Sequence, residues 1–217
     1  CEFDKELDKN TLKAYRIDLR QYYEFTGEEI TSKETIEKYI RLLHKKYKSR
    51  TTKRKIASMK AFYTYLEEKQ IISENPFRRI RTKFKEEKVL PRIIPKNDIE
   101  RLLNYMYGQL RKQKGKNILR DLAVVEMFFA TGARVYEISN IRIENIDMKT
   151  GSIYFNGKGR KERVIQIGEQ SVIKLLQKYY EQNKAQIEKS GYFFVNQKGD
   201  RFSEQSIRRM LKKYTKQ

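Results

Sequence analysis

The chain has 217 residues, which suits one large or two small domains. Hydrophobic residues make up 38% and aromatic residues 12% of it, and this content excludes an intrinsically disordered protein. Lysine and arginine number 49 against 28 aspartates and glutamates, and the formal net charge of +21 favours a polyanion, DNA or RNA, as the partner. A lysine-rich host proteome is the alternative explanation of this excess.

The chain contains a single cysteine, Cys1, and a single histidine, His44. We therefore expect no internal disulfide, no zinc site, and a reducing, cytoplasmic location. The sequence shows no signal peptide and no apolar stretch of membrane-spanning length, so no membrane contact is expected. Because Cys1 stands where methionine is expected, the natural N-terminus is predicted to lie upstream.

Apolar residues recur at helical spacing in the first 80 residues and predict three helices and a short fourth piece beginning near Pro76. A capping box from Thr31 to Glu34 is predicted to start the second helix, and Ser49 is predicted to cap the third. The stripes expected to face the core are Leu12, Tyr15, Leu19, Tyr22 and Tyr23; Ile36, Tyr39, Ile40, Leu43 and Tyr47; and Ile56, Met59, Phe62, Tyr63 and Leu66.

Periodicity fails in residues 81–95, where a charged run is followed by Pro91 and Pro95. This composition predicts an interdomain linker. The predicted organisation is therefore a helical domain over residues 1–82, a linker over 83–95, and a second domain over 96–217.

The second half is predicted to mix helices with a small β-hairpin. Asn97 is expected to cap a helix, residues 119–130 form a buried helix that stops at Gly132, and residues 134–140 form a short one. Strands over 152–155 and 163–167 flank a basic turn, and a short strand or an extended run is expected at 193–195. Further helices are expected around 172–179 and after Ser203. The fold class is thus mainly α, with a helical first domain and a mixed α+β second domain.

The most informative stretch is Ala130-Thr-Gly-Ala-Arg134, followed by Glu137. An arginine just after a buried helix is held by a rigid scaffold, and its planar fork can bind two phosphate oxygens at once. The alternative is a structural salt bridge between Arg134 and Glu137.

A second stretch, Gly157-Lys-Gly-Arg-Lys-Glu-Arg163, places Lys158 between two glycines at the tip of the predicted hairpin. Such a lysine is sterically open and can deliver a proton to a leaving oxygen. The alternative is a solvated basic turn.

Taken together and in this order, the two stretches resemble the tyrosine recombinases, in particular the Xer-like and phage or transposon integrase branch. The resemblance covers nearly the whole chain, because the first half looks like the family's SAM-like core-binding domain. The segments that carry this second likeness are 10–19, 51–66 and 72–77.

The resemblance implies site-specific DNA recombination through a covalent 3′-phosphotyrosine. It implies that Arg134 stabilises charge on the scissile phosphate, that Glu137 orients Arg134, and that Lys158 protonates the departing 5′ oxygen. Rejoining needs no ATP, and no cofactor, metal or small-molecule ligand is expected. The implied partners are duplex DNA with inverted-repeat sites and further copies of the chain, as a homo-tetramer on DNA. The implied source is a bacterium, an archaeon, a phage or a mobile element.

The chain departs from the family pattern in its last part. The family's second box carries His-x-x-Arg and then the nucleophile, yet no histidine follows His44. Tyr214 shares helical spacing with Ile207, Met210 and Leu211, so it is expected in the core and not as the nucleophile. We therefore expect a C-terminally incomplete catalytic domain, inactive on its own.

Phosphate contacts are expected from two groups of side chains, on the third helix and beside the hairpin. They are Arg50, Thr52, Lys53, Arg54 and Lys60, and Arg160, Lys161 and Arg163. Each one can instead be solvated surface. Two functions compete with recombination: a non-catalytic DNA-binding regulator on an integrase scaffold, and a basic RNA-binding protein, for which the sequence has no signature.

Overall fold

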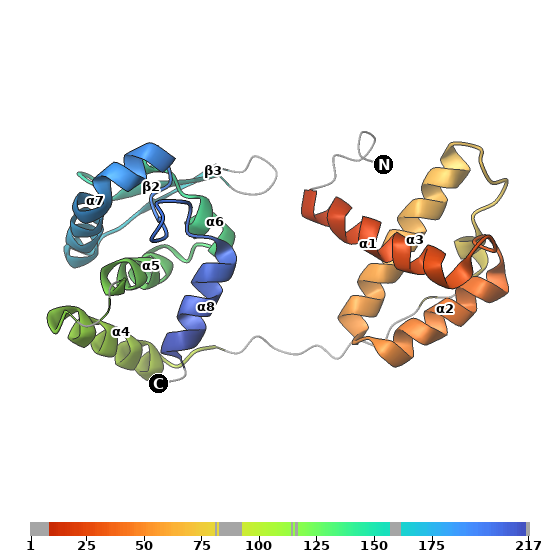
Figure 1. Cartoon of the computed structure of the whole chain (residues 1–217), viewed down its shortest axis with the longest axis horizontal. Helices are drawn as coiled ribbons and strands as arrows, with labels where there is room; N and C mark the ends of the chain where they lie inside the picture. The colour runs from red at the N-terminus through yellow and green to blue at the C-terminus, as the bar shows by residue number, and fades with distance from the viewer. Residues whose placement is uncertain are drawn as a thin grey trace. The chain divides into compact units, whose positions relative to one another are not determined.

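A computed structural model describes residues 9–80, 82, 93–113, 115, 117–156 and 162–215. The chain divides into two compact units, Cys1–Pro91 and Arg92–Gln217, and each is described by itself (Figure 1). Most of the predicted linker lies outside the described residues.

The first unit contains three α-helices and one short 3-10 helix among its described residues. Their bounds are α1 Lys9–Thr26, α2 Lys33–Lys46, α3 Ser49–Glu68 and η1 Pro76–Arg79. The core is rich in tyrosine, and the hydroxyls of Tyr22 and Tyr63 lie 2.7 Å apart, both donating to the carbonyl oxygen of Ile30. These bonds let aromatic rings fill the core without leaving a hydroxyl unpaired.

Three local predictions for this unit were wrong. Ser49 does not cap α3 but is its first residue, and Lys48 takes the N-cap position. Ser32 and not Thr31 caps α2, because the Ser32 side chain accepts a hydrogen bond from the Thr35 amide. Tyr23, predicted to face the core, is 60% exposed, while Asp18 on the same helix is buried. Core-facing positions on α1 therefore include a carboxylate, and spacing of apolar residues alone misplaces the buried face.

The second unit packs its helices against one face of a small antiparallel sheet, since Ile153 and Phe155 are buried in the core whereas Tyr154 and Val164 are exposed. The helices are α4 Lys96–Arg111, α5 Ile118–Thr131, α6 Val135–Asn140, η2 Ile143–Asn145, α7 Gln170–Ser190 and α8 Glu204–Tyr214. The strands, in the order β1-β2-β3, are β1 Ile146–Asp147, β2 Ser152–Asn156 and β3 Glu162–Gln166. The predicted fold class, mainly α with a small sheet, is confirmed. The short strand β1 was not predicted, and residues 193–195 form no strand. The Phe193 amide donates to the Ile141 carbonyl, Phe193 and Phe194 lie in a bend, and Val195 makes an isolated bridge with Arg201.

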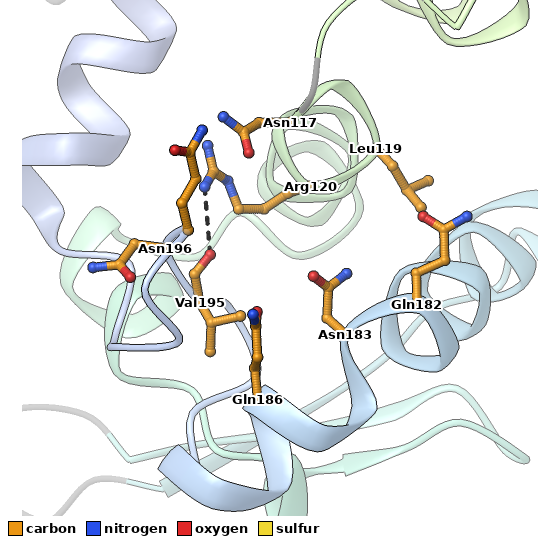
Figure 2. A pocket seen from close by; sticks show the side chains of 9 residues that line it. Asn117, Leu119, Arg120, Gln182, Asn183, Gln186, Val195 and Asn196 are labelled. Atoms are coloured by element: carbon orange, nitrogen blue, oxygen red, sulfur yellow. Dashed lines mark hydrogen bonds between the residues drawn. The ribbon is translucent and has the colours of Figure 1, made fainter.

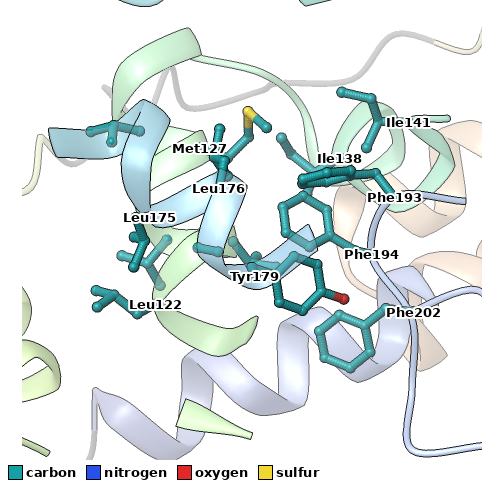
Figure 3. Packing of buried hydrophobic residues seen from close by; sticks show 14 of the residues in the cluster. Leu122, Met127, Ile138, Ile141, Leu175, Leu176, Tyr179, Phe193, Phe194 and Phe202 are labelled. Atoms are coloured by element: carbon teal, nitrogen blue, oxygen red, sulfur yellow. The ribbon is translucent and has the colours of Figure 1, made fainter. Parts of the chain in front are cut away.

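The core of this unit is built around α5, which is apolar on nearly every side and packs against α4 and α7. An aromatic cluster lies beside it, where the ring of Tyr179 is 5.6 Å from that of Phe193 and 5.5 Å from that of Phe194 (Figure 3). The Tyr179 hydroxyl accepts a hydrogen bond from the Val195 amide at 3.0 Å. Ser203 caps α8 as predicted.

Candidate active site around Arg134

A three-residue link, residues 132–134, joins α5 to α6. Gly132 ends α5 with φ +59°, a left-handed conformation that costs a residue with a side chain about 1 kcal/mol or more. The Thr131 hydroxyl accepts a hydrogen bond from the Ala133 amide at 3.2 Å. These contacts place Arg134 directly before α6, with its side chain 76% exposed.

Glu137 holds Arg134 through the backbone more firmly than through the side chain. The Arg134 amide donates to Oε2 of Glu137 at 2.6 Å, whereas Nη1 of Arg134 lies 3.3 Å from Oε1. The first bond is one half of a capping box, which satisfies an amide at the helix N-terminus that would otherwise lack a partner.

The stronger side-chain partner of Glu137 is Arg163 on β3. Its Nη1 and Nη2 lie 3.0 Å and 2.9 Å from the two carboxylate oxygens, the two-pronged geometry of an arginine–carboxylate pair. Sequence reasoning placed Arg163 among the phosphate contacts and missed this pair. Alternation along β3 could have revealed it, because Arg163 lies on the same face as Ile165, which points toward the core.

The environment of Glu137 keeps its carboxyl ionised. Burial raises the pKa of this carboxyl, but the hydrogen bond from the Arg134 amide and the bonds and charge of Arg163 outweigh burial and lower the pKa below its ordinary value. The site therefore consists of one buried anion and two guanidinium groups.

Lys158, Arg160 and Lys161 lie outside the described residues. Their position in the sequence nevertheless links them to the site, since they fall between β2 and β3 and Arg163 is the second residue of β3.

On α3, the side chains of Arg50, Lys53, Arg54 and Lys60 are exposed. Lys60 donates to the hydroxyl of Thr82 at 2.6 Å. The prediction that Thr52 lies on this exposed face was wrong: Thr52 is 0% exposed and donates to the Leu43 carbonyl at 3.1 Å. Its spacing from Ile56, Met59 and Tyr63 puts it on the buried stripe.

A buried charge cluster behind α3 was also missed. Asp18 on α1 binds both Arg54 and Lys55, with the Lys55 ammonium 2.9 Å from Oδ1. Lys55 also donates to Gln21 and lies 5.0 Å from the centre of the Tyr47 ring. Both charged partners of this pair are almost fully buried, at 1% exposure for the Asp18 side chain and 4% for Lys55.

Tyr214 is part of the core, as predicted. It is buried on α8, and its hydroxyl donates to Asp121 at 3.1 Å. Burial and the nearby Asp121 carboxylate raise the pKa of Tyr214, which disfavours the ionised, nucleophilic form.

A polar pocket of about 200 Å³ lies between the start of α5, α7 and the turn after Val195 (Figure 2). Its charged lining residue, Arg120, is already engaged, because it pairs with Asp121 at 2.7 Å and lies 3.9 Å from the centre of the Phe202 ring. This arginine thus joins α5 to the turn and does not resemble a catalytic group. Among the described residues, no acidic, histidine or cysteine side chains cluster as a metal site. None of the described helices has the length and apolar character needed to cross a bilayer.

Comparisons with known proteins match both units of the chain. The family model "Phage integrase family" matches residues 92–217, and "Phage integrase, N-terminal SAM-like domain" matches residues 2–70. A tyrosine recombinase of Agathobacter rectalis is 42% identical over 99% of this chain and 72% of its own length. Tyrosine recombinase XerC of Thermodesulfovibrio yellowstonii is 30% identical over 95% of this chain and 69% of its own.

Among solved structures, Lambda Integrase bound to DNA shares the fold with a TM-score of 0.73. It is 13% identical in sequence, over 98% of this chain and 72% of that one. With both units matched in order by family models and a tyrosine recombinase 42% identical over nearly the whole chain, the chain belongs to the phage integrase family of tyrosine recombinases.

Proposed function

We propose that this protein is a site-specific recombinase that cuts and rejoins duplex DNA through a 3′-phosphotyrosine intermediate. The observation that carries the proposal is Arg134, whose guanidinium is exposed while its backbone is fixed by the left-handed turn at Gly132 on one side and by the buried Glu137 carboxylate on the other. A cation placed before the substrate arrives stabilises charge on a phosphate without reorganisation during the reaction.

The proposed roles follow the order of the chemistry. Arg134 binds non-bridging oxygens of the scissile phosphate, and Lys158 protonates the 5′ oxygen as it leaves. The covalent intermediate conserves the phosphoester bond, so the 5′ hydroxyl can attack it and rejoin the strand without ATP or another cofactor.

The two units have separate tasks in this proposal. Residues 1–82 form the core-binding domain, residues 83–95 the linker, and residues 96–217 the catalytic part. Arg50, Lys53, Arg54 and Lys60 on α3, together with Arg160 and Lys161, contact phosphates, which position the protein without reading sequence. The net charge of +21 supports such contacts. The DNA substrate carries inverted-repeat sites, and four copies of the protein assemble on two duplexes. The reaction takes place in the cytoplasm.

Residues 1–217 on their own are proposed to bind DNA without cleaving it. The second-box pattern His-x-x-Arg does not occur among them, since the only histidine is His44. Tyr214 cannot replace the nucleophile while its hydroxyl is buried against Asp121.

The test compares the 217-residue chain with the protein expressed from its whole reading frame. Both are incubated with the best-bound duplex recovered from a randomised pool, carrying a nick so that a covalent intermediate accumulates. We expect both to bind with a steep salt dependence, and only the longer protein to leave a phosphotyrosine adduct. Binding without an adduct by the longer protein supports the non-catalytic regulator instead, and a flat salt response contradicts both.

A further inference from the structure

Glu137 has two arginine partners, and its carboxylate binds one of them more closely than the other. Arg163 contacts both carboxylate oxygens, at 3.0 Å and 2.9 Å, whereas the Arg134 side chain makes one longer contact of 3.3 Å. Two short parallel bonds are stronger than one long bond. The carboxylate is thus committed mainly to Arg163.

Arg163 is also supported from its other side. In the register of β2 and β3 it lies opposite Phe155, and its guanidinium carbon is 5.2 Å from the centre of that buried ring. A cation near an aromatic face gains electrostatic attraction. Between this ring and Glu137, the Arg163 side chain is 36% exposed, compared with 76% for Arg134.

The balance of charge follows from these contacts. Two guanidinium groups and one carboxylate leave one net positive charge, and the exposed member that carries it is Arg134. If Arg163 were absent, the Glu137 side chain, only 3% exposed, would keep Arg134 as its remaining guanidinium partner. A buried, uncompensated carboxylate attracts a nearby cation strongly.

We propose that Arg163 is a positioning residue: by occupying both oxygens of Glu137 it leaves the guanidinium of Arg134 free to bind the scissile phosphate. The inference rests on the proposed function and assigns Arg163 to the interior of the site, in place of a contact with DNA. The same pair also joins β3 to α6, and so connects the strand that follows Lys158 to the helix that follows Arg134.

The first test follows the side-chain Nε–H signals of arginine by NMR in the 217-residue chain. A short duplex of random sequence is added at low salt. We expect the Arg134 signal to shift and the Arg163 signal to stay in place. In Arg163→Ala the shift of Arg134 should be lost, and in the double variant Glu137→Gln with Arg163→Ala it should return, because no carboxylate remains to hold Arg134.

Three outcomes of this test contradict either the proposed function or the positioning role of Arg163, and each outcome can be told from the others. If the Arg134 signal of the wild type does not shift when DNA is added, Arg134 does not bind phosphate, and the proposed function is contradicted. An Arg134 signal that still shifts in Arg163→Ala overturns only the positioning role. An Arg163 signal that shifts as much as that of Arg134 shows that Arg163 contacts DNA.

The second test measures adduct formation by the protein from the whole reading frame. We expect Arg163→Ala to slow it about 100-fold, the effect of misplacing a reacting group by about an ångström, while duplex affinity changes little. Adding Glu137→Gln should recover at least about tenfold of this loss. A double variant as slow as Arg163→Ala would show a merely structural role.

Two further variants keep this test decisive. Arg163→Lys keeps the charge but loses the two-pronged geometry, so it tests the positioning role even if Arg163→Ala does not fold. Slower cleavage by Arg163→Lys supports the proposal, and a wild-type rate overturns it. Arg101→Ala is the matched control, because Arg101 is an exposed arginine paired with a carboxylate, Asp98, outside this site. Its rate should equal that of the wild type.

Discussion

Removing the Asp18 carboxylate should destabilise the first unit far more than a surface ion pair would. In Asp18→Ala the Lys55 ammonium, 4% exposed, keeps Gln21 and the Tyr47 ring as its partners among the described residues. Breaking a buried ion pair by removing one member costs about 3–5 kcal/mol. The lost contact with Arg54, whose side chain is 43% exposed, adds about 1 kcal/mol or less.

This loss is large compared with the total stability of such a unit. At about 0.05–0.15 kcal/mol per residue, residues 9–80 amount to about 4–11 kcal/mol of unfolding free energy. Asp18→Ala should therefore remove about a third of it or more. Hydrogen exchange in the whole chain under increasing urea measures the effect, with peptides from residues 93–215 as an internal reference.

The double variant Asp18→Ala with Lys55→Met provides the control, because it removes both charges. It should regain most of the lost stability, since a buried pair replaced by apolar groups of similar volume is often neutral. A loss below about 1 kcal/mol in Asp18→Ala, with no gain from Lys55→Met, would mean that water solvates Lys55 and would refute the reasoning.

Three other predictions concern the site, α3 and the aromatic cluster. In the whole enzyme, Arg134→Ala should slow adduct formation about 100- to 1000-fold and spare duplex binding, measured by gel shift; parallel loss of binding would mark Arg134 as a structural anchor. Thr52→Val should lower the free energy of unfolding in urea by about 1 kcal/mol without weakening DNA binding. Lys53→Ala should instead reduce the slope of log DNA affinity against log salt concentration by about 0.9. Equal losses of DNA affinity in the two variants would contradict the buried position of Thr52. Burial raises the pKa of Tyr179 from 10.0 to about 12. The neutral Tyr179 hydroxyl therefore contributes about 3 kcal/mol to the free energy of unfolding, fully below pH about 10, and this contribution is lost as the pH rises through about 12. Urea unfolding at a series of pH values should show a shallower alkaline loss for Tyr179→Phe, and an unchanged slope would contradict this account.

Local signals in the sequence predicted much of this structure. The end of α5 at Gly132, the cap at Ser203 and the helix at Pro76 all depend on backbone chemistry within a few residues. The hairpin was predicted because its strands alternate around a glycine-rich turn. Such features need no knowledge of the rest of the chain.

Three helix caps were misplaced by one or two residues, at Thr31, Ser49 and Asn97. The failures that affect the core and the site concern residues whose partners lie elsewhere in the chain. Thr52 was taken as exposed because it is polar, but its hydroxyl reaches the Leu43 carbonyl. The buried pair of Asp18 and Lys55 joins two helices that only the folded chain brings together. The link between Glu137 and Arg163 spans α6 and β3 in the same way. Composition marks such residues as polar, and only tertiary contact reveals that they are internal.

The turn at Gly132 makes the position of Arg134 depend on the packing of α5. Since this helix is surrounded by the core on nearly every side, a change of volume there moves its end and with it the arginine. A genetic screen for inactive variants should therefore recover substitutions such as Leu122 or Met127 to smaller residues, in proteins that still fold and still bind DNA. Loss of function in this family need not map to residues that touch the nucleic acid.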